Sequence, residues 1–327
     1  MTRYILKRLL NYAVLLFIAI SLVYLLAGWV LNPYAVYAAR QPPVDPAVIE
    51  QMMLRYNLSH NVPLLERYGV WLSNIVTSWD WGRSPEGAYV NEQIASRVGV
   101  SIRLMLIGTI TSIIVGVGIG AWTATRQYKI SDRVITFLSL LFVSTPIFVI
   151  GLASQVLAVH INRTTGLNIF EFVGETGRTG NYPFAAVFDR LQHLLLPTLA
   201  LFITSAASFS RIQRNLMLDS LGQDYVRTAR AKGLPYSKAV TKHALRTALI
   251  PTGTYVAFTV ATMFTGATLT ETVFSFNGIG RYLVETIGGH DVNGVTAVAA
   301  FSGVCVIVGA ILSDIVVAVL DPRVRLG

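Results

Sequence analysis

The chain has 327 residues, of which 53% are hydrophobic and 13% are charged, and its formal net charge is +9. A soluble domain usually has about twice this charged fraction, so the composition argues against a soluble globular protein. The hydrophobic residues are grouped in charge-free runs, several of them as long as the roughly 20 residues that a helix needs to cross a bilayer. The composition therefore indicates an all-α, multi-pass membrane protein.

Six charge-free runs predict six transmembrane helices. The first follows a basic start, but it is longer than the apolar core of a signal peptide and no small-residue cleavage site follows it, so we expect a retained helix. The fourth is shorter and contains Pro197, which a membrane helix tolerates where neighbouring groups bond the freed carbonyl. The predicted runs are 9–31, 104–125, 134–159, 194–210, 247–270 and 292–313.

The distribution of basic residues predicts the orientation. Six spans place both termini on the same side as the loops that follow the second and fourth spans. That side holds most of the basic residues and every lysine, namely Lys7, Lys129, Lys232, Lys238 and Lys242. By the positive-inside rule it is the cytoplasmic side. The net positive charge is thus explained by topology and requires no nucleic-acid partner.

Three regions follow from this pattern. Residues 1–31 form the N-terminus and the first transmembrane helix, and residues 104–327 form a five-helix core with a cytoplasmic loop at 211–246. Residues 32–103 begin with several prolines and continue into 45–73, where apolar residues recur at helical spacing. This spacing predicts a small, mainly helical external subdomain between the first two transmembrane helices.

The cytoplasmic loop contains a predicted short helix with start and stop signals. Asp224 is typical of a helix N-cap, because its carboxylate can accept from the free N–H groups of the first turn. Gly233 is typical of the left-handed residue past a helix end, and Pro235 prevents continuation. A second helix is expected from Ser237 into the fifth span. From the residues alone, the loop is either a partner-binding element or a basic segment that only fixes topology.

Other polar and small residues favour structural roles. The spacing of Gly116 and Gly120 permits close helix packing, more simply within the chain than with a partner. Asp314 and Glu271, at the ends of two spans, are expected to make structural contacts, although a proton relay or a gate is the alternative. Cys305 has no partner cysteine, and the histidines are dispersed, so we expect no metal site and no bound cofactor. No P-loop pattern is present, so the chain is not expected to hydrolyse ATP itself.

The stretch from Asp224 to Pro251, with its Thr-Ala-Arg-Ala-Lys-Gly core, resembles the "EAA" coupling motif of binding-protein-dependent ABC importer permeases, in the wording of the oligopeptide/dipeptide branch. Arg227 stands where the general motif has Glu, so no role of that Glu is transferred. Further similarity lies in the segments 80–84 (DWGRS), 193–197 (HLLLP), 271–274 (ETVF), 278–280 (GIG) and 321–325 (DPRVR).

The resemblance implies a multi-pass permease of the bacterial inner membrane, which is not an enzyme and moves peptides by alternating access. Its implied partners are a second permease, two cytoplasmic ATPases that hold ATP and Mg²⁺, an extracytoplasmic binding protein and the lipid bilayer. The residues implied to couple to an ATPase are Asp224, Tyr225, Arg227, Thr228, Ala229, Arg230, Ala231, Lys232 and Gly233. Those implied to contact the binding protein are Asp80, Trp81, Gly82, Arg83 and Ser84.

Other functions remain as alternatives. Related importers take chelated nickel or glutathione, and the residues do not separate these substrates from peptides. An ion-coupled secondary transporter is disfavoured, because such proteins usually have buried ionisable residues at mid-membrane and broken helices in repeated halves. A membrane-embedded enzyme would need a nucleophile with its base, or metal ligands, inside the spans, and the sequence has neither.

Overall fold

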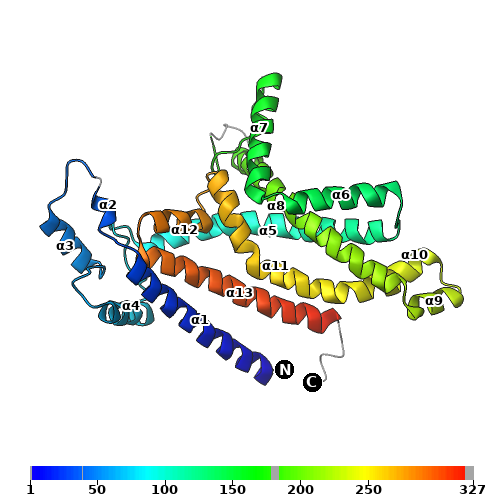
Figure 1. Ribbon diagram of the computed structural model, residues 1–327, viewed down its shortest axis with the longest axis horizontal. Helices are drawn as coiled ribbons and strands as arrows, with labels where there is room; N and C mark the ends of the chain where they lie inside the picture. The colour runs from blue at the N-terminus through cyan, green and yellow to red at the C-terminus, as the bar shows by residue number, and fades with distance from the viewer. Residues whose placement is uncertain (1, 39, 178–183, 321–327) are drawn as a thin grey trace. The chain divides into compact units, whose positions relative to one another are not determined.

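The computed structural model describes residues 2–38, 40–177 and 184–320, and its regular secondary structure there is helical apart from one isolated β-bridge between Arg83 and Tyr89 (Figure 1). The backbone divides into two compact units. Unit 1 comprises Met1–Ile102 and Asn277–Ile307, and unit 2 comprises Arg103–Phe276 and Val308–Gly327. The predicted all-helical class is therefore confirmed for the described residues.

Unit 1 contains the helices at both ends of the sequence and those of the predicted external subdomain. It holds α1 (Thr2–Val30), α2 (Ala35–Ala38), α3 (Pro46–Arg55), α4 (Leu64–Ser78), the start of α5 (Val90–Ala124), α12 (Ile279–Gly288) and most of α13 (Val292–Leu320). Helix α3 begins where the sequence provides a cap, because the Asp45 carboxylate accepts from the Ala47 N–H at 2.8 Å and Pro46 opens the first turn. The predicted helical content of residues 45–73 is confirmed.

The core of unit 1 joins α1 to the subdomain helices through aromatic side chains. Tyr24 of α1 stacks on Trp71 of α4 with ring centroids 4.5 Å apart, and both side chains are buried. The Tyr68 hydroxyl lies 2.7 Å from the Ser21 hydroxyl. Such aromatic packing buries large apolar areas, so the subdomain is anchored on the second half of α1.

Unit 2 contains the remaining helices. They are the rest of α5, α6 (Ile130–Ser144), α7 (Ile147–Thr165), α8 (Ala185–Leu221), α9 (Asp224–Ala231), α10 (Tyr236–Ala239), the π-helical segment η1 (Val240–Ala244) and α11 (Leu245–Val273). Helix α8 includes Pro197 within its length. The predicted fourth span thus gains the residues before His193, as expected, and also extends eleven residues past Ser210 to Leu221.

The prediction of one continuous third span over 134–159 is wrong. The structure has two helices there, α6 and α7, which run in different directions in Figure 1. The break lies at Thr145 and Pro146: Thr145 is extended with φ −92° and ψ 123°, and Pro146 precedes the first residue of α7. Proline lacks an N–H and disfavours helical geometry at the residue before it, and this local effect outweighs the hydrophobicity of the run.

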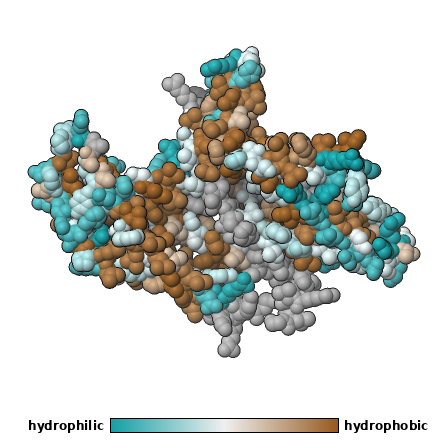
Figure 2. All heavy atoms as spheres, in the orientation of Figure 1, coloured by the Kyte–Doolittle hydropathy of each residue, from teal (hydrophilic) through white to brown (hydrophobic). Residues whose placement is uncertain are grey.

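Five helical segments within the described residues are long and apolar enough to cross a membrane: Arg8–Ala38, Val90–Ala124, Ile147–Thr165, Ala185–Leu221 and Val292–Leu312. They correspond to the first, second, third, fourth and sixth predicted spans, the third shortened to α7. The fifth predicted span, 247–270, lies in α11, where several side chains fall outside the described set. Hydrophobic residues cover much of α1 and α7 in Figure 2, whereas hydrophilic residues gather over α9 and α10.

Close packing of α5 on α8 depends on two glycines. A Cβ atom at Gly116 would lie 2.7 Å from the Ala206 carbonyl oxygen, and one at Gly120 would overlap the Ser210 carbonyl oxygen. Gly118, between them, has no atom within 4 Å of its Cβ position. The expectation that this glycine spacing serves packing within the chain is confirmed, because small residues allow membrane helices to approach backbone to backbone.

Candidate coupling surface

Helix α9 begins one residue earlier than its sequence signal suggests. The prediction that Asp224 is the N-cap is wrong, because Gln223 occupies that position with extended geometry and no side-chain cap hydrogen bond forms. Asp224 is instead in the first turn, where its carboxylate lies 3.8 Å from the Arg227 guanidinium. Its negative charge there still interacts favourably with the positive end of the helix dipole. The tight connection from α8 through Gly222 shifts the cap to the residue before Asp224.

The end of α9 matches the expected glycine stop. Gly233 has φ +86°, its N–H donates to the Arg230 carbonyl at 2.9 Å, and the Leu234 N–H donates to the Ala229 carbonyl at 3.2 Å. These two bonds form a Schellman motif, which satisfies carbonyls that the helix leaves free. Position 233 therefore requires a residue that tolerates the left-handed conformation, and glycine does so without strain.

One face of α9 is fixed to the rest of unit 2. Val226 and Ala229 are buried in a cluster with residues of α8, α5, α10 and η1, which we call the α9 core. Its buried members are Ala124, Met217, Val226, Ala229, Ala239, Val240, Ala244 and Ala248. The two alanines of the motif consequently differ, because Ala229 packs inward while Ala231 is exposed. Of these two small residues, only Ala231 is available to a partner.

The other face of α9 is charged and open. Asp224, Tyr225, Arg227, Thr228 and Lys232 are all exposed, and the Asp224 and Arg227 side chains are 97% and 75% accessible. A shallow hollow of about 560 Å³ lies beside this face, lined by Arg227, Arg230, Ala231, Gly233, Leu234, Pro235 and Tyr236.

Arginines dominate the charge at this hollow. The Arg230 guanidinium lies 5.5 Å from the centre of the Tyr236 ring, an arrangement that holds the cation over an aromatic face. The hollow is complementary in charge to an acidic or carbonyl-rich protein surface.

After the turn at 232–235, a continuous helical path leads from α10 to the predicted fifth span. Helix α10 starts at Tyr236, one residue before the expected Ser237, and continues through η1 into α11 without a break. In η1 the Leu245 N–H donates to the Val240 carbonyl, the wider spacing that defines a π-helical turn. Such turns are often found at functional positions in helices, and this one lies between α9 and the membrane helix.

Two polar contacts attach α8, which precedes α9, to its neighbours. The Arg214 guanidinium donates twice to the Asp132 carboxylate of α6, at 2.6 and 2.8 Å, and Asp132 is buried. These hydrogen bonds hold the pKa of Asp132 below its usual range. The Thr252 hydroxyl of α11 donates to the Gln213 side chain at 2.5 Å. Sequence reasoning did not anticipate the Asp132–Arg214 pair, because the two residues lie 82 positions apart.

The residues expected to contact a binding protein form a tight turn in unit 1. The Asp80 carboxylate accepts from the Gly82 N–H at 2.9 Å, and the Trp81 N–H donates to the Asn91 side chain at 3.0 Å. Arg83 lies over the Tyr89 ring, with its guanidinium carbon 3.7 Å from the ring centre. All five residues from position 80 to 84 are half-buried. Their polar groups stabilise the turn, and their role in binding a partner remains a prediction.

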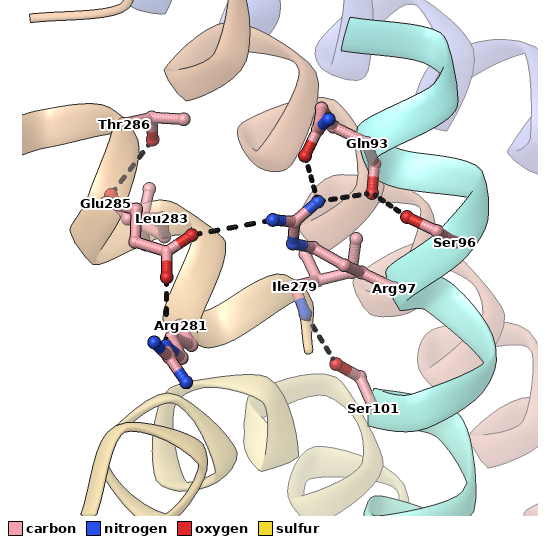
Figure 3. Close-up of polar contacts among 9 residues, drawn as sticks. All are labelled: Gln93, Ser96, Arg97, Ser101, Ile279, Arg281, Leu283, Glu285 and Thr286. Carbon is pink, nitrogen blue, oxygen red and sulfur yellow. Dashed lines mark hydrogen bonds and ion pairs between the residues drawn. The ribbon is translucent and has the colours of Figure 1, made fainter. Parts of the chain in front are cut away.

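A group of charged residues where α5 contacts α12, in unit 1, was not anticipated from the sequence. Arg97, near the start of α5, donates to Gln93 and lies 3.6 Å from the Glu285 carboxylate (Figure 3). Its guanidinium carbon also lies 4.6 Å from the centre of the Tyr282 ring. The Ser101 hydroxyl accepts from the Ile279 N–H at 2.7 Å, which satisfies the start of α12. These contacts fix α12 against α5. Arg97 and Glu285 are 188 residues apart in the sequence, so no local pattern could have paired them.

Asp291 lies just before α13 and is buried, with 3% of its surface exposed. Its carboxylate accepts from the Gly294 N–H at 2.9 Å, yet burial raises the pKa of Asp291 to about 6. Burial raises the pKa of Tyr282 above its usual value, and the negative charge of Asp291 adds to this effect. Within the part of the chain that the structure describes, no three His, Cys, Asp or Glu side chains are grouped as metal ligands.

Comparison with known proteins supplies the family. Residues 116–326 match the family described as "Binding-protein-dependent transport system inner membrane component". The oligopeptide transport system permease protein OppB of Mycobacterium tuberculosis is 45% identical over 329 residues, covering 100% of both chains. AppB of Bacillus subtilis is 34% identical over 87% of each chain, and the dipeptide transport system permease protein DppB of Lactococcus lactis is 32% identical over 100% of each.

The chain belongs to this family. It is an inner membrane component of a transport system, as the resemblance implied, and the permease is a non-catalytic membrane subunit within that system. The matched residues include α9, the Gly116–Gly120 spacing and the motifs at His193 and Glu271, but not the turn at 80–84. The terminal motif at 321–325 lies outside the described residues.

Proposed function

We propose that this permease imports peptides by alternating access, and that α9 couples it to a cytoplasmic ATPase. The observation that supports the proposal is the two-faced packing of α9. Its buried face, with Val226 and Ala229, is fixed to α8 and η1, while its charged face is open. A rigid-body displacement of a helix held in this way is transmitted to the helices that it contacts, since packed interfaces change between discrete arrangements and do not deform freely.

The contacts of α8 with its neighbouring helices would transmit this displacement. A push on α9 reaches α8 through Met217 and α11 through η1, and the pair of Asp132 and Arg214 extends it to α6. Because the pair is bidentate and Asp132 is buried, it resists sliding of α8 against α6. The exposed cations Arg227, Arg230 and Lys232 favour an acidic or carbonyl-rich groove on the ATPase.

The proposed assembly has both termini in the cytoplasm, with the external subdomain between the first two membrane helices. A second permease completes the pathway, two ATPases hold ATP and Mg²⁺, and a binding protein delivers substrate outside, where the turn at 80–84 of this chain is the proposed contact. Peptides are the proposed substrate because OppB, AppB and DppB are named for peptide transport. Chelated nickel and glutathione are the alternatives that the experiment must separate.

Uptake into proteoliposomes tests the function. The permease, its companion permease, the ATPases and the binding protein are reconstituted, and accumulation of short peptides, glutathione and nickel chelates is measured with ATP. A non-hydrolysable ATP analogue and an ionophore serve as controls. We expect peptide accumulation that requires ATP hydrolysis and survives loss of ion gradients. Accumulation that follows an ion gradient without ATP would refute the importer, and ATP-driven uptake of only nickel chelates would refute the peptide assignment.

A further inference from the structure

Helix α4 presents three distinct faces. The first packs on α1 and the subdomain, through Arg67, Trp71 and neighbouring residues. The second is exposed and mainly polar, and consists of Glu66, Ser73, Asn74 and Thr77 together with Val70. The third is apolar and mostly exposed, and we call it the α4 stripe: Leu65, Gly69, Leu72, Val76 and Trp79. Within this stripe Leu72 packs partly on the unit 1 core, and the Trp79 ring lies 5.8 Å from the Trp81 ring. These positions recur at three- and four-residue intervals, which places them on one side of a helix.

The α4 stripe is exposed at four of its five positions, and Leu72 is half-buried. Leu65, Val76 and Trp79 are 73%, 77% and 68% exposed, and a Cβ atom at Gly69 would meet no other atom within 4 Å. The stripe contains no charged side chain. A contiguous apolar surface beside a polar one is uncommon on a water-exposed helix and marks a binding surface. A helix with one apolar and one polar exposed face is typical of helices that lie in the plane of a membrane interface.

The contacts of α4 with α1 set its depth. Leu64, Tyr68 and Trp71 lie against Gly28, Ser21 and Tyr24 respectively, inside the charge-free run of α1. Tyr24 precedes the end of that run, Leu31, by seven residues, which is roughly 10 Å along a helix. An amphipathic helix typically lies with its apolar face about 5–10 Å into the boundary between headgroups and acyl chains. The attachment point therefore holds α4 at the depth of the outer leaflet.

The free face of α1 supports the same environment. Leu22, Leu26 and Trp29 lie on the face of α1 opposite Tyr24 and are 54%, 58% and 79% exposed, as expected for a helix that faces lipid. Trp29 and Trp79 are exposed aromatic residues at the end of α1 and of α4. Tryptophan is enriched at the membrane–water interface, where its ring is amphipathic. Helix α4 is thus attached to α1 at a level where the free face of α1 is apolar and exposed.

We propose that the α4 stripe is seated in the outer leaflet of the bilayer, so that α4 is an interfacial helix that anchors the external subdomain. A binding protein is a poorer occupant, because a partner that associates and dissociates in each cycle typically uses a more polar surface. The polar face of α4 and the turn at 80–84 remain available on the aqueous side. This assignment is independent of α9 and of the transported substrate.

Spin labelling of the assembled transporter tests the proposal. The only cysteine is replaced in a Cys305→Ala background, and a nitroxide is attached at Val76→Cys, Leu65→Cys or Asn74→Cys. All three sites are exposed, so the labels displace no core side chain. The full complex is placed in phosphatidylcholine nanodiscs, and collisions with oxygen, which partitions into lipid, are compared with collisions with a water-soluble chromium complex.

We expect labels at positions 76 and 65 to collide with oxygen and to be shielded from chromium, and the label at position 74, on the polar face, to show the reverse. Equal access of chromium to positions 76 and 74 would overturn the proposal. Protection of position 76 that develops only when the binding protein is added would identify a protein-docking surface instead. Shielding from both reagents without binding protein would identify a contact with another subunit.

A second measurement needs no label at the stripe. Brominated phosphatidylcholine quenches tryptophan fluorescence on contact with the ring, and Trp79→Phe removes the predicted interfacial tryptophan. We expect the quenched fraction of the fluorescence to fall in this variant relative to the unmodified complex. An unchanged quenched fraction would show that Trp79 does not reach the lipid.

Discussion

Helices α9 and α4 are both short and amphipathic, and both pack through one face, yet their free faces are opposite in character. The free face of α9 carries Asp224, Arg227 and Lys232, whereas the α4 stripe consists of apolar residues, with Leu65, Val76 and Trp79 largely exposed. The buried faces are both mainly apolar, formed by small aliphatic residues in α9 and by aromatic residues in α4. The difference therefore lies in what each helix leaves exposed.

This comparison shows that one face of each helix determines its position and that the other face determines its partner. The buried face determines where a helix lies, because apolar burial is non-directional and scales with the area removed from water. The free face determines what can bind, because a charged surface favours a polar protein groove and an uncharged apolar one favours lipid. The predictions below disturb one face at a time.

The largest effect is expected where the support of α9 is disturbed. Gly120→Leu would drive a side chain into the Ser210 carbonyl and the Gln213 side chain of α8, which leads to α9. Backbone atoms cannot move aside cheaply, so we expect destabilisation of at least about 3 kcal/mol, the upper end for overpacking. Gly118→Leu is the matched control, because its Cβ position is open. Thermal unfolding of the purified complex measures both, and equal stability of the two variants would contradict the packing.

A change at the end of α9 should affect coupling more than folding. Gly233→Val places a β-branched residue at φ +86°, a strain of about 1–3 kcal/mol that the exposed loop can relieve by moving. We expect ATP-driven uptake to fall by more than tenfold, while membrane insertion is retained. Gly222→Val is the control, because Gly222 is right-handed with φ −76° and its nearest neighbour atom is 3.8 Å from the Cβ position. Normal uptake by Gly233→Val would remove α9 from the coupling role.

The parts of this comparison that the sequence predicts are local. The end of α9 at Gly233 depends on one residue's conformational freedom and follows from a short pattern, and so does the Gly116–Gly120 spacing. The break at Pro146 was equally local, and it was missed because the run was judged by hydrophobicity alone although proline outweighs hydrophobicity in setting helix ends.

The parts that the sequence does not predict are contacts between distant residues. Arg214 lies 82 residues from Asp132, and Arg97 lies 188 residues from Glu285, so their pairing depends on helix packing that no periodicity encodes. The apolar residues of α4 were expected from their spacing, but the spacing alone does not say which of them the core leaves exposed. The division between the buried face and the α4 stripe required the position of α1.

The comparison of faces extends to buried charge in unit 1. The folded-state pKa of Asp291, about 6, lies above the ordinary value of 3.8, so the folded state favours the protonated form. The contribution of Asp291 to the free energy of unfolding is therefore most favourable below pH 4 and falls as the pH rises towards 6. Above pH 6 the ionised carboxylate lowers the free energy of unfolding by at most about 3 kcal/mol.

Asp291→Asn should remove that penalty while keeping an oxygen acceptor for the Gly294 N–H. We expect the variant to unfold at a higher temperature than the unmodified complex at pH 7.5, and the gain to shrink to about a third at pH 4.5, where most of the Asp291 penalty is absent. Thermal unfolding at the two pH values measures the difference. A variant whose gain is the same at both pH values would show that Asp291 does not titrate in this range.

The smallest structural effect is expected on the free face of α9, and it is the most informative for partner choice. Arg227 and Asp224 form an exposed pair at 3.8 Å, and solvent screens such pairs so strongly that they contribute little to folding. Arg227→Ala should therefore leave thermal unfolding unchanged, yet reduce uptake about two- to fivefold if the cation contacts an ATPase groove. Asp224→Ala removes the other member of the pair, so a loss of uptake in Arg227→Ala that is absent in Asp224→Ala assigns the effect to the cation. Uptake equal to that of the unmodified transporter in both variants would exclude a contribution of this pair to coupling and leave Arg230 and Lys232 as the remaining cations of the charged face.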